Sequence, residues 1–296
     1  MPDEKTKECL KIAVLGGDRR QLTAAERLQE LNYAVSLYGF DTYGESGFRS
    51  LEEAVTGASC LLFPVPVIRN DRWNLPFSEE KLTASEVMAR IAPYLDGVTH
   101  AFGGVIPEEV ASFLRGRGIS VCDLTEEERF NVLNAVPTAE GAIAIAMNHL
   151  DVTLNGSSVA VLGFGRIGKA LCRPLLALGA KVTAVSRKEP DRALSEIYGC
   201  RAVGYEALPA LAGEFDVIFN TVPAVVLTEE VLRSVKKDAL VIDLASRPGG
   251  VDTDAALRWG IPVVVALSLP GKVAPVTAGR IIAHCLHDAV KGGTLS

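Results

Sequence analysis

The chain has 296 residues, of which 48% are hydrophobic, and a formal net charge of −6 at pH 7. This length allows two domains of ordinary size, each with a core of its own. The acidic balance, without a long run of Lys or Arg, argues against a nucleic acid or an anionic membrane surface as a partner.

The first residues, "MPDEKTKECLK", are charged and contain no apolar segment, so we expect no secretory signal. The apolar runs along the chain have the length of strands or are broken by polar residues, which predicts no membrane-spanning helix. Six cysteines are scattered without a C-x-x-C pair, as is typical of reduced thiols rather than of a disulfide or metal framework. We therefore expect a cytoplasmic protein without a metal site.

Short apolar runs alternate with amphipathic segments of helix length, as in "KIAVLG", "YAVSLYG", "ASCLLFPV" and "VTHAFGG", and again in "SVAVLG", "KVTAVS", "DVIFNTV" and "ALVIDLA". This rhythm predicts an α/β fold of two Rossmann-like, doubly wound parallel-sheet domains. We place the first domain at residues 1–134 and the second at 151–269. A long connecting helix would join them at 135–150, and the C-terminal helix within 270–296 would return to the first domain.

The connecting helix is expected to open at "PTAEG". Thr138 would be its N-cap, and Glu140 would lie in its first turn beside the helix dipole.

The two domains begin with the same plan. "AVLGGDRRQ" and "AVLGFGRIG" align at an offset of 147 residues, and the same offset aligns their second strands. The later copy has Gly163, Gly165 and Gly168, whereas the earlier copy has Asp18 and Gln21 at the last two of these places. Because a glycine lets the backbone approach a diphosphate closely, only the later copy is predicted to bind a dinucleotide.

The predicted cofactor turn follows a buried strand and opens a helix, which is the setting that gives a G-x-G-x-x-G pattern its meaning. Its residues are Gly163, Phe164, Gly165, Arg166, Ile167 and Gly168. An NAD site would place an acid at the end of the next strand, where this chain has Ser186, Arg187 and Lys188. A hydroxyl and two cations suit a 2′-phosphate, so we predict NADP. The alternative is a solvated surface pair.

Two further strand ends are predicted to line the cofactor. They are "FNTVP", with Thr221, Val222 and Pro223, and "VIDLASRPGG", with Leu244 and Ala245. Ligands of doubly wound sheets lie at the carboxyl ends of the strands. The alternative is that both are ordinary turns.

The segment "LVIDLASRPGGVD" resembles the D-2-hydroxyacid dehydrogenases, in which the matching arginine, here Arg247, binds the substrate carboxylate. "LPGKVAPVTAG" resembles alanine dehydrogenase and the nicotinamide nucleotide transhydrogenases. Together with "PTAEGAIAIAMNH", nearly the whole chain resembles the family of dipicolinate synthase A subunits. The resemblance implies a cytoplasmic oxidoreductase of the mother cell in sporulation, on a branch of lysine biosynthesis.

By the same resemblance, the chain would oxidise dihydrodipicolinate to dipicolinate with NADP, alongside the flavoprotein-like B subunit of dipicolinate synthase. We also expect a homo-oligomer. The small dicarboxylate substrate is a dianion, so its pocket needs two cations or equivalent donors. The catalytic candidates are Arg247, Lys272 and Glu140, and the substrate contacts are Gly103, Gly104, Thr138 and Arg247.

Each candidate has an alternative. Arg247 could pair with Asp243 or Asp252, and Lys272 could be a surface lysine. The glycine pair in "FGGV" could be only a turn, and Glu140 could serve the helix dipole alone.

The His–Glu pair of the hydroxyacid dehydrogenases has no counterpart, because His284 and His287 fall in the tail helix. His100 remains a possible base. Two alternatives therefore stay open: a nucleotide-binding regulatory or non-catalytic subunit of a two-subunit synthase, and an NADP-dependent 2-hydroxyacid or amino-acid dehydrogenase.

Overall fold

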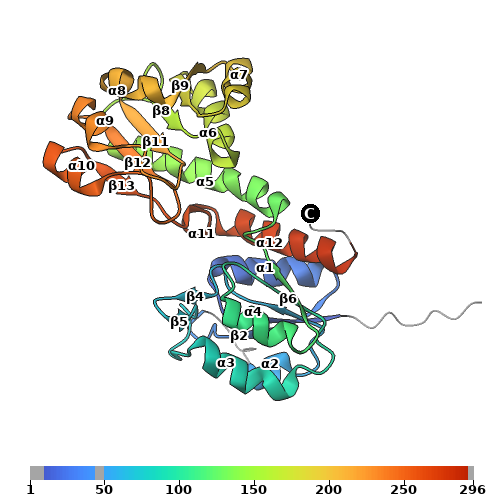
Figure 1. Cartoon of the computed structure of the whole chain (residues 1–296). Coiled ribbons are helices and arrows are strands. Elements are labelled where there is room, and N and C mark those ends of the chain that lie inside the picture. The colour runs from blue at the N-terminus through green and yellow to red at the C-terminus, as the bar shows by residue number, and fades with distance from the viewer. Residues whose placement is uncertain (1–9, 44–49, 293–296) are drawn as a thin grey trace, which may run out of the picture. The chain divides into compact units, whose positions relative to one another are not determined.

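The computed structural model describes residues 10–43 and 50–292, so the charged N-terminal segment lies outside the described residues. The chain forms two compact units (Figure 1). Unit 1 consists of Met1–Leu133 together with Pro275–Ser296, and unit 2 consists of Asn134–Ala274.

Unit 1 contains a five-stranded parallel sheet in the order β2-β1-β3-β6-β7. Its strands are β1 (Lys11–Leu15), β2 (Ala34–Tyr38), β3 (Cys60–Leu62), β6 (His100–Gly103) and β7 (Ser120–Asp123). The strands β4 (Ile68–Arg69) and β5 (Arg72–Trp73) form a small antiparallel hairpin. The helices are α1 (Arg19–Glu30), α2 (Leu51–Val55), α3 (Ala84–Ile91), the 3-10 turn Ala92–Tyr94, α4 (Glu108–Arg115) and α12 (Pro275–Val290).

Both faces of this sheet are buried, as parallel sheets require. Side chains of α2, α3 and α4, such as Val87 and Leu114, form the core on one face. Those of α1 and α12, such as Leu28 and Ile282, form it on the other. The C-terminal helix thus belongs to the first sheet, as predicted.

Helix α12 packs directly on α1. A Cβ added to Gly279 would overlap the carbonyl oxygen of Arg20, so the helices pack together there at a spacing that requires glycine. At the edges of this contact the Nε of Arg27 donates to the Nε2 of His284 at 3.2 Å, and the hydroxyl of Tyr33 lies 3.0 Å from the Nδ1 of His287.

Unit 2 contains a six-stranded parallel sheet in the order β10-β9-β8-β11-β12-β13. Its strands are β8 (Ser158–Leu162), β9 (Lys181–Val185), β10 (Arg201–Val203), β11 (Val217–Asn220), β12 (Leu240–Asp243) and β13 (Val263–Val265). Its helices are α6 (Arg166–Ala177), α7 (Glu189–Ile197), α8 (Leu208–Leu211), α9 (Glu229–Ser234), α10 (Thr253–Trp259), α11 (Leu269–Val273) and the 3-10 turns Tyr205–Ala207 and Ala212–Glu214. The strand order reverses beside β8, which is the doubly wound topology predicted, with its ligand crevice at the reversal.

The prediction that the connecting helix opens at residues 137–138 is wrong, because the helix α5 spans Glu128–His149. Pro137 lies inside α5, and Thr138 is no N-cap, because its hydroxyl donates to the carbonyl of Asn134 at 2.8 Å one turn earlier. A proline within a helix costs roughly 3 kcal/mol. Burial of Ala135 and Ala139 on either side of it lets tertiary packing override that local preference. Glu140 therefore does not lie in a first turn.

In the described part of the chain, α5 is also the one helix with the length and apolar composition that a membrane crossing would need. Half of its 18-residue apolar stretch is buried within the fold.

Candidate cofactor and substrate site

The turn after β8 requires its glycines. Gly163 has a φ of +91°, and its N–H donates to the carbonyl of Val185 at 2.9 Å. A Cβ on Gly163 would lie 2.5 Å from the Oγ1 of Thr221, and a Cβ on Gly168 would overlap the carbonyl oxygen of Gly163. These two positions hold the strand, the turn and the helix together at a spacing that no other residue allows.

The third glycine, Gly165, has a different part. It is the N-cap of α6, it makes no side-chain cap, and a Cβ placed on it would meet no atom within 4 Å. No acidic residue occupies the first turn of α6. The space beside Gly165 is therefore open, with the positive end of the helix dipole behind it, which suits an anion.

The predicted residues of the turn differ in what they expose. Gly165 and Arg166 are exposed, and Ile167 is half-buried. Phe164 is only 2% exposed, and its ring packs edge-on against Tyr198 with the centroids 5.6 Å apart. The side chain of Phe164 thus packs in the core beneath the turn and is not presented to a ligand.

The end of β9 carries the predicted cations. Arg187 and Lys188 are exposed, and neither has an ion pair among the residues that the structure describes. Ser186 is buried, and its hydroxyl donates to the carbonyl of Lys188 at 3.3 Å. The two cationic side chains are thus the groups that this loop presents to solvent.

Sequence reasoning missed Arg192, which holds this loop. From α7 its Nη1 donates to the carbonyl oxygens of Arg187 at 3.0 Å and of Ser186 at 3.3 Å. Its place four residues after Lys188, in a segment that begins as a helix, is the signal that could have revealed it.

Tyr205 follows β10 and was also missed. Burial raises the pKa of its hydroxyl to about 12, while the backbone of Gly163 and the charge of Arg187 act to lower it. The Tyr205 hydroxyl therefore lies close to both the glycine turn and the cationic loop. The strand before it, β10, has only three residues, too few to show a pattern in the sequence.

The ends of β11 and β12 lie side by side, with Asn220 paired in register with Asp243. The Nδ2 of Asn220 donates to the Oδ1 of Asp243 at 2.8 Å and to the carbonyl of Val222 at 3.0 Å. The N–H and the Oγ1 of Thr221 both donate to the carbonyl of Leu162, at 2.9 and 2.8 Å. The segment containing Thr221 and Val222 is thereby fixed beside the glycine turn, with both side chains half-buried and Pro223 exposed.

The loop after β12 carries Arg247, whose side chain is exposed. Leu244 and Ala245, predicted to line the cofactor, have buried side chains, 6% and 4% exposed. The alternative in which Arg247 pairs with Asp243 or Asp252 is wrong, because no such ion pair occurs among the described residues. Asp243 accepts hydrogen bonds from Asn220 and from backbone N–H groups, and Asp252 caps α10.

Thr138, Glu140 and Lys272 lie on two helices that touch. A Cβ on Gly141 of α5 would lie 2.9 Å from Val273 and 3.2 Å from Leu269, so α11 packs on α5 at this glycine. Glu140 and Lys272 are exposed, and Thr138 is half-buried. The three are thus carried by neighbouring helices of unit 2.

One prediction for unit 1 is wrong, and the structure places a second candidate, His100, at the start of a strand. The N–H of Gly104 cannot hold a carboxylate, because it donates to the carbonyl of Pro64 at 3.1 Å. Gly103 and Gly104 are instead buried under the loop after β3, with Cβ positions 3.0 Å from Phe63 and 2.6 Å from Val65. His100 is the first residue of β6, so it lies at the amino edge of the sheet, where its Nδ1 contacts the Thr99 hydroxyl at 2.8 Å.

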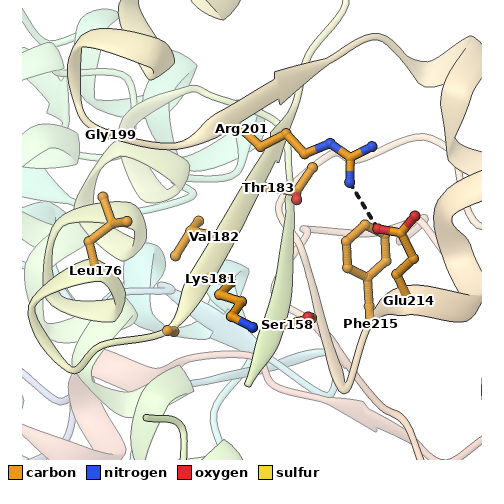
Figure 2. Close-up of a pocket in the computed structure, with 10 residues that line it drawn as sticks. Ser158, Leu176, Lys181, Val182, Thr183, Gly199, Arg201, Glu214 and Phe215 are labelled. Carbon is orange, nitrogen blue, oxygen red and sulfur yellow. Dashed lines mark hydrogen bonds and ion pairs between the residues drawn. The ribbon is translucent and has the colours of Figure 1, made fainter. Parts of the chain in front are cut away.

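A cavity of about 370 Å³ lies elsewhere in unit 2 (Figure 2). Its lining includes Ser158, Lys181 and Arg201, the first residues of β8, β9 and β10. Arg201 crosses it to pair with Glu214 at 2.8 Å. The cavity therefore lies at the amino edge of the sheet, opposite the glycine turn, and it is not the cofactor site.

The two units match different family models. Residues 11–125 match the N-terminal domain of the dipicolinate synthase A subunit. Residues 138–259 match the NAD binding domain of the D-isomer specific 2-hydroxyacid dehydrogenases. Unit 2 is therefore a domain of the kind that binds a nicotinamide cofactor.

Similarity to solved structures extends over nearly the whole chain. The structure of the dipicolinate synthase A subunit from Bacillus halodurans is 31% identical with a TM-score of 0.84, covering 95% of this chain and 97% of that one. The A chain of dipicolinate synthase from Bacillus subtilis is 32% identical with a TM-score of 0.83, covering 96% of each. A transhydrogenase from Sinorhizobium meliloti, 17% identical with a TM-score of 0.68 over 95% of this chain and 94% of that one, shares the fold.

Among curated proteins, the dipicolinate synthase A subunit of Bacillus subtilis (strain 168) is 34% identical over 288 residues, which are 94% of each chain. With one of its domains matched by a model specific to that protein and the other by a dehydrogenase model, this chain belongs to the family of dipicolinate synthase A subunits.

Proposed function

We propose that this chain is the NADP-dependent subunit that oxidises dihydrodipicolinate to dipicolinate, pyridine-2,6-dicarboxylate. The observation that carries the proposal is the carboxyl edge of the unit 2 sheet. There an uncapped helix start at Gly165, an exposed cationic loop at Arg187 and Lys188, and the exposed Arg247 follow strands β8, β9 and β12 of one sheet.

The residues present fit a dinucleotide. The N–H groups of Gly165, Arg166 and Ile167 would hold the diphosphate, because the glycine leaves room for it and the helix dipole favours its charge. The nicotinamide, when bound, supplies the hydride acceptor.

The cationic loop favours NADP over NAD. The acid that would accept hydrogen bonds from a ribose 2′-hydroxyl is absent, and Arg187 and Lys188 stand in its place. Charge-assisted hydrogen bonds to a phosphate dianion are stronger than neutral ones. Arg192 keeps the loop in place by holding the carbonyls of Ser186 and Arg187.

Arg247 would bind one carboxylate of the substrate through its planar guanidinium. Lys272 and Thr138 would contact the second carboxylate, and Glu140 would accept the proton. Gly104 has no part in this proposal, since its N–H is already used. The reaction moves a hydride from one ring carbon to the nicotinamide and a proton from its neighbour to the protein, leaving an aromatic ring. The protein therefore needs mainly to align donor and acceptor carbons.

The positions of the four histidines argue against the reaction of an ordinary 2-hydroxyacid dehydrogenase. His284 and His287 contact Arg27 and Tyr33 in unit 1, and His149 contacts the carbonyl of Ile145. His100 begins a strand of unit 1. None of them follows a strand of the cofactor sheet.

The setting of this activity follows from the family and belongs to the proposal. An A subunit implies a second kind of subunit, and we infer the flavoprotein-like B subunit of dipicolinate synthase together with self-association of this chain. We place the complex in the cytoplasm of the mother cell during sporulation, on a branch of lysine biosynthesis.

The test mixes the purified chain with NADP and freshly generated dihydrodipicolinate, with and without the partner subunit, and follows the absorbance of the reduced cofactor. We expect one NADPH for each dipicolinate formed. Arg247→Ala should lower kcat/KM by about 100-fold without changing the Kd for NADP. Arg258→Ala, which removes an exposed arginine paired with Glu229, is the control and should change neither.

Three results would contradict the proposal. Full activity of the Arg247→Ala complex would mean that the partner carries the chemistry and this chain is a regulatory nucleotide-binding subunit. Turnover of 2-hydroxy acids would assign the usual dehydrogenase reaction. Loss of NADP binding in Arg247→Ala would make that arginine structural.

A further inference from the structure

Asn220 and Asp243 form a buried amide–carboxylate pair at the carboxyl edge of the unit 2 sheet. Asn220 is fully buried and Asp243 is 4% exposed. In the described part of the chain Asp243 has no ion pair. Its carboxylate is instead satisfied by three N–H groups, from the Nδ2 of Asn220 at 2.8 Å and the backbone of Ala245 at 3.1 Å and Gly250 at 3.0 Å.

These hydrogen bonds span the Arg247 loop. Ala245 and Gly250 lie on either side of Arg247, and both bind the same carboxylate, so Asp243 fixes the two ends of the loop while Arg247 remains exposed between them. The carbonyl of Gly250 accepts from the N–H groups of Val226 and Leu227, at 3.1 and 3.0 Å, which anchors the far end further.

Asn220 connects this loop to the other cofactor-side loop. Its Oδ1 accepts from the N–H of Val222 at 3.2 Å, and its Nδ2 donates to the carbonyl of Val222. A Cβ on Gly250 would overlap the Nδ2 of Asn220 and lie 2.5 Å from the carbonyl oxygen of Val222. The two loops are therefore in contact, and Gly250 is the residue that permits it.

A buried carboxylate without a cation is unfavourable unless its hydrogen bonds are complete. The opposite edge of the same sheet shows a different solution, because Asp216 is about one-third exposed and pairs with Lys236 at 2.7 Å. Among the described residues Asp243 is the one acidic residue in the buried class, and it lies beside the loop that carries the exposed Arg247.

We infer that Asp243, oriented by Asn220, is a positioning residue that sets the guanidinium of Arg247 for a substrate carboxylate. This inference rests on the proposed function. Two buried side chains, Asn220 and Asp243, would thus control how the dianionic substrate is bound without contacting it.

The test uses Asp243→Asn in the complex with the partner subunit. We expect the KM for dihydrodipicolinate to rise by about 10-fold, with the Kd for NADP changed by less than about 3-fold. Amide hydrogens of residues 244–251 should exchange faster in this variant. The matched control is Asp216→Asn, which should lower Tm and leave the KM unchanged.

A double-variant cycle with Arg247→Ala decides whether the pair acts through the arginine. If it does, adding Asp243→Asn to Arg247→Ala has no further effect on kcat/KM. Additive losses would overturn the inference, as would an equal loss of NADP affinity or an unchanged KM in Asp243→Asn. If Arg247→Ala leaves kcat/KM unchanged, that result would instead overturn the substrate contact of the proposed function. If Asp243→Asn does not fold, Asn220→Ser should raise the KM by about 3-fold, and an unchanged KM there would equally overturn the inference.

Discussion

The Gly16 turn of unit 1 and the Gly163 turn of unit 2 are two outcomes of one backbone plan. The elements β1, α1 and β2 have the same lengths as β8, α6 and β9 and precede them by the same 147 residues. The N–H of Gly16 donates to Tyr38, and that of Gly163 donates to Val185, both at 2.9 Å. Both glycines have positive φ. The repeat in the sequence is thus a repeat in structure down to single hydrogen bonds.

The two turns differ in what covers them. In unit 1 the N–H of Gly17 donates to the carbonyl of Asn74, and Leu75 lies 2.5 Å from a Cβ built on Gly16. Asp18 caps α1 with its own carboxylate, which also binds Arg20. In unit 2 the corresponding N-cap is bare. If the proposed site is correct, this plan binds a nucleotide where side chains are left out, and not where the chain supplies its own anion.

The strongest way to break this contrast is Gly165→Asp, which places the carboxylate of Asp18 at the equivalent position of unit 2. The new side chain would cap α6 and repel a diphosphate, so we expect the affinity for NADP to fall by more than about 100-fold. The fold should persist because a Cβ there meets no atom within 4 Å. Calorimetric titration measures the affinity, and thermal unfolding measures the stability.

Gly165→Ala is the matched control for that variant. It adds the Cβ without the charge, and we expect a much smaller loss of affinity. Equal losses in the two variants would mean that bulk, not the competing anion, separates the two turns.

The second test concerns the strand ends after each copy. Where unit 2 has Arg187 and Lys188, unit 1 has Phe40 and Asp41 at the same offset. Arg187→Asp combined with Lys188→Ala should lower the affinity for NADP by about 30-fold and leave that for NAD nearly unchanged. Arg173→Asp, at an exposed site on α6, controls for reversing the charge of one exposed arginine. An unaltered preference for NADP would show that the 2′-phosphate lies elsewhere.

The third test removes the anion from unit 1. Asp18→Ala should lower the free energy of unfolding by more than about 1 kcal/mol, because it removes an N-cap and also leaves the buried Arg20 without its ion-pair partner. Nucleotide binding should remain at one per chain, because the segment containing Asn74 and Leu75 still covers the turn. Denaturant unfolding and the titration stoichiometry check both statements, and a second bound nucleotide would refute the role given to that segment.

The smallest expected effect concerns the starts of the two first strands. Lys11 binds the carbonyl of Thr56 through its Nζ, whereas the N–H of Ser158 donates to Asp216. Burial acts to raise the pKa of Asp216, but its hydrogen bonds with Lys236 and Ser158 outweigh this and hold the pKa below its usual value.

A lowered pKa in the folded state stabilises the fold above the ordinary Asp value, about pH 4, and this contribution is lost as pH falls through the lower folded value. Because Asp216 is about one-third exposed, we expect Asp216→Asn to cost about 0.5 kcal/mol at pH 7. The cost should shrink below pH 4 in denaturant titrations. A constant difference across that range would assign it to packing instead of charge.

Features written in local patterns were predictable from the sequence. The alternation of apolar runs and amphipathic segments predicted both sheets, and the spacing of Gly163, Gly165 and Gly168 predicted the glycine turn after β8. The start of α5 was not predictable, because Pro137 signals a helix start locally and only burial of the surrounding alanines overrides it.

The missed residues of the site depend on contacts between distant segments. The N–H of Gly104 donates a hydrogen bond to the carbonyl of Pro64, which lies 40 residues earlier in a loop with no periodic pattern. Asn220 was visible as a polar strand end, but its bond to Asp243 exists only because β11 and β12 pair in that register. A single sequence states where strands lie more readily than which residues face each other across them.

The close packing of α12 on α1 has a consequence for biosynthesis. Residues 134–274 are synthesised as one uninterrupted stretch, so unit 2 has all of its residues before α12 is made. Unit 1 waits for α12, although most of it is made first, and until then the surface of α1 around Arg20 and Leu28 lacks its cover. A nonsense mutation within α12 would therefore damage unit 1 and spare unit 2.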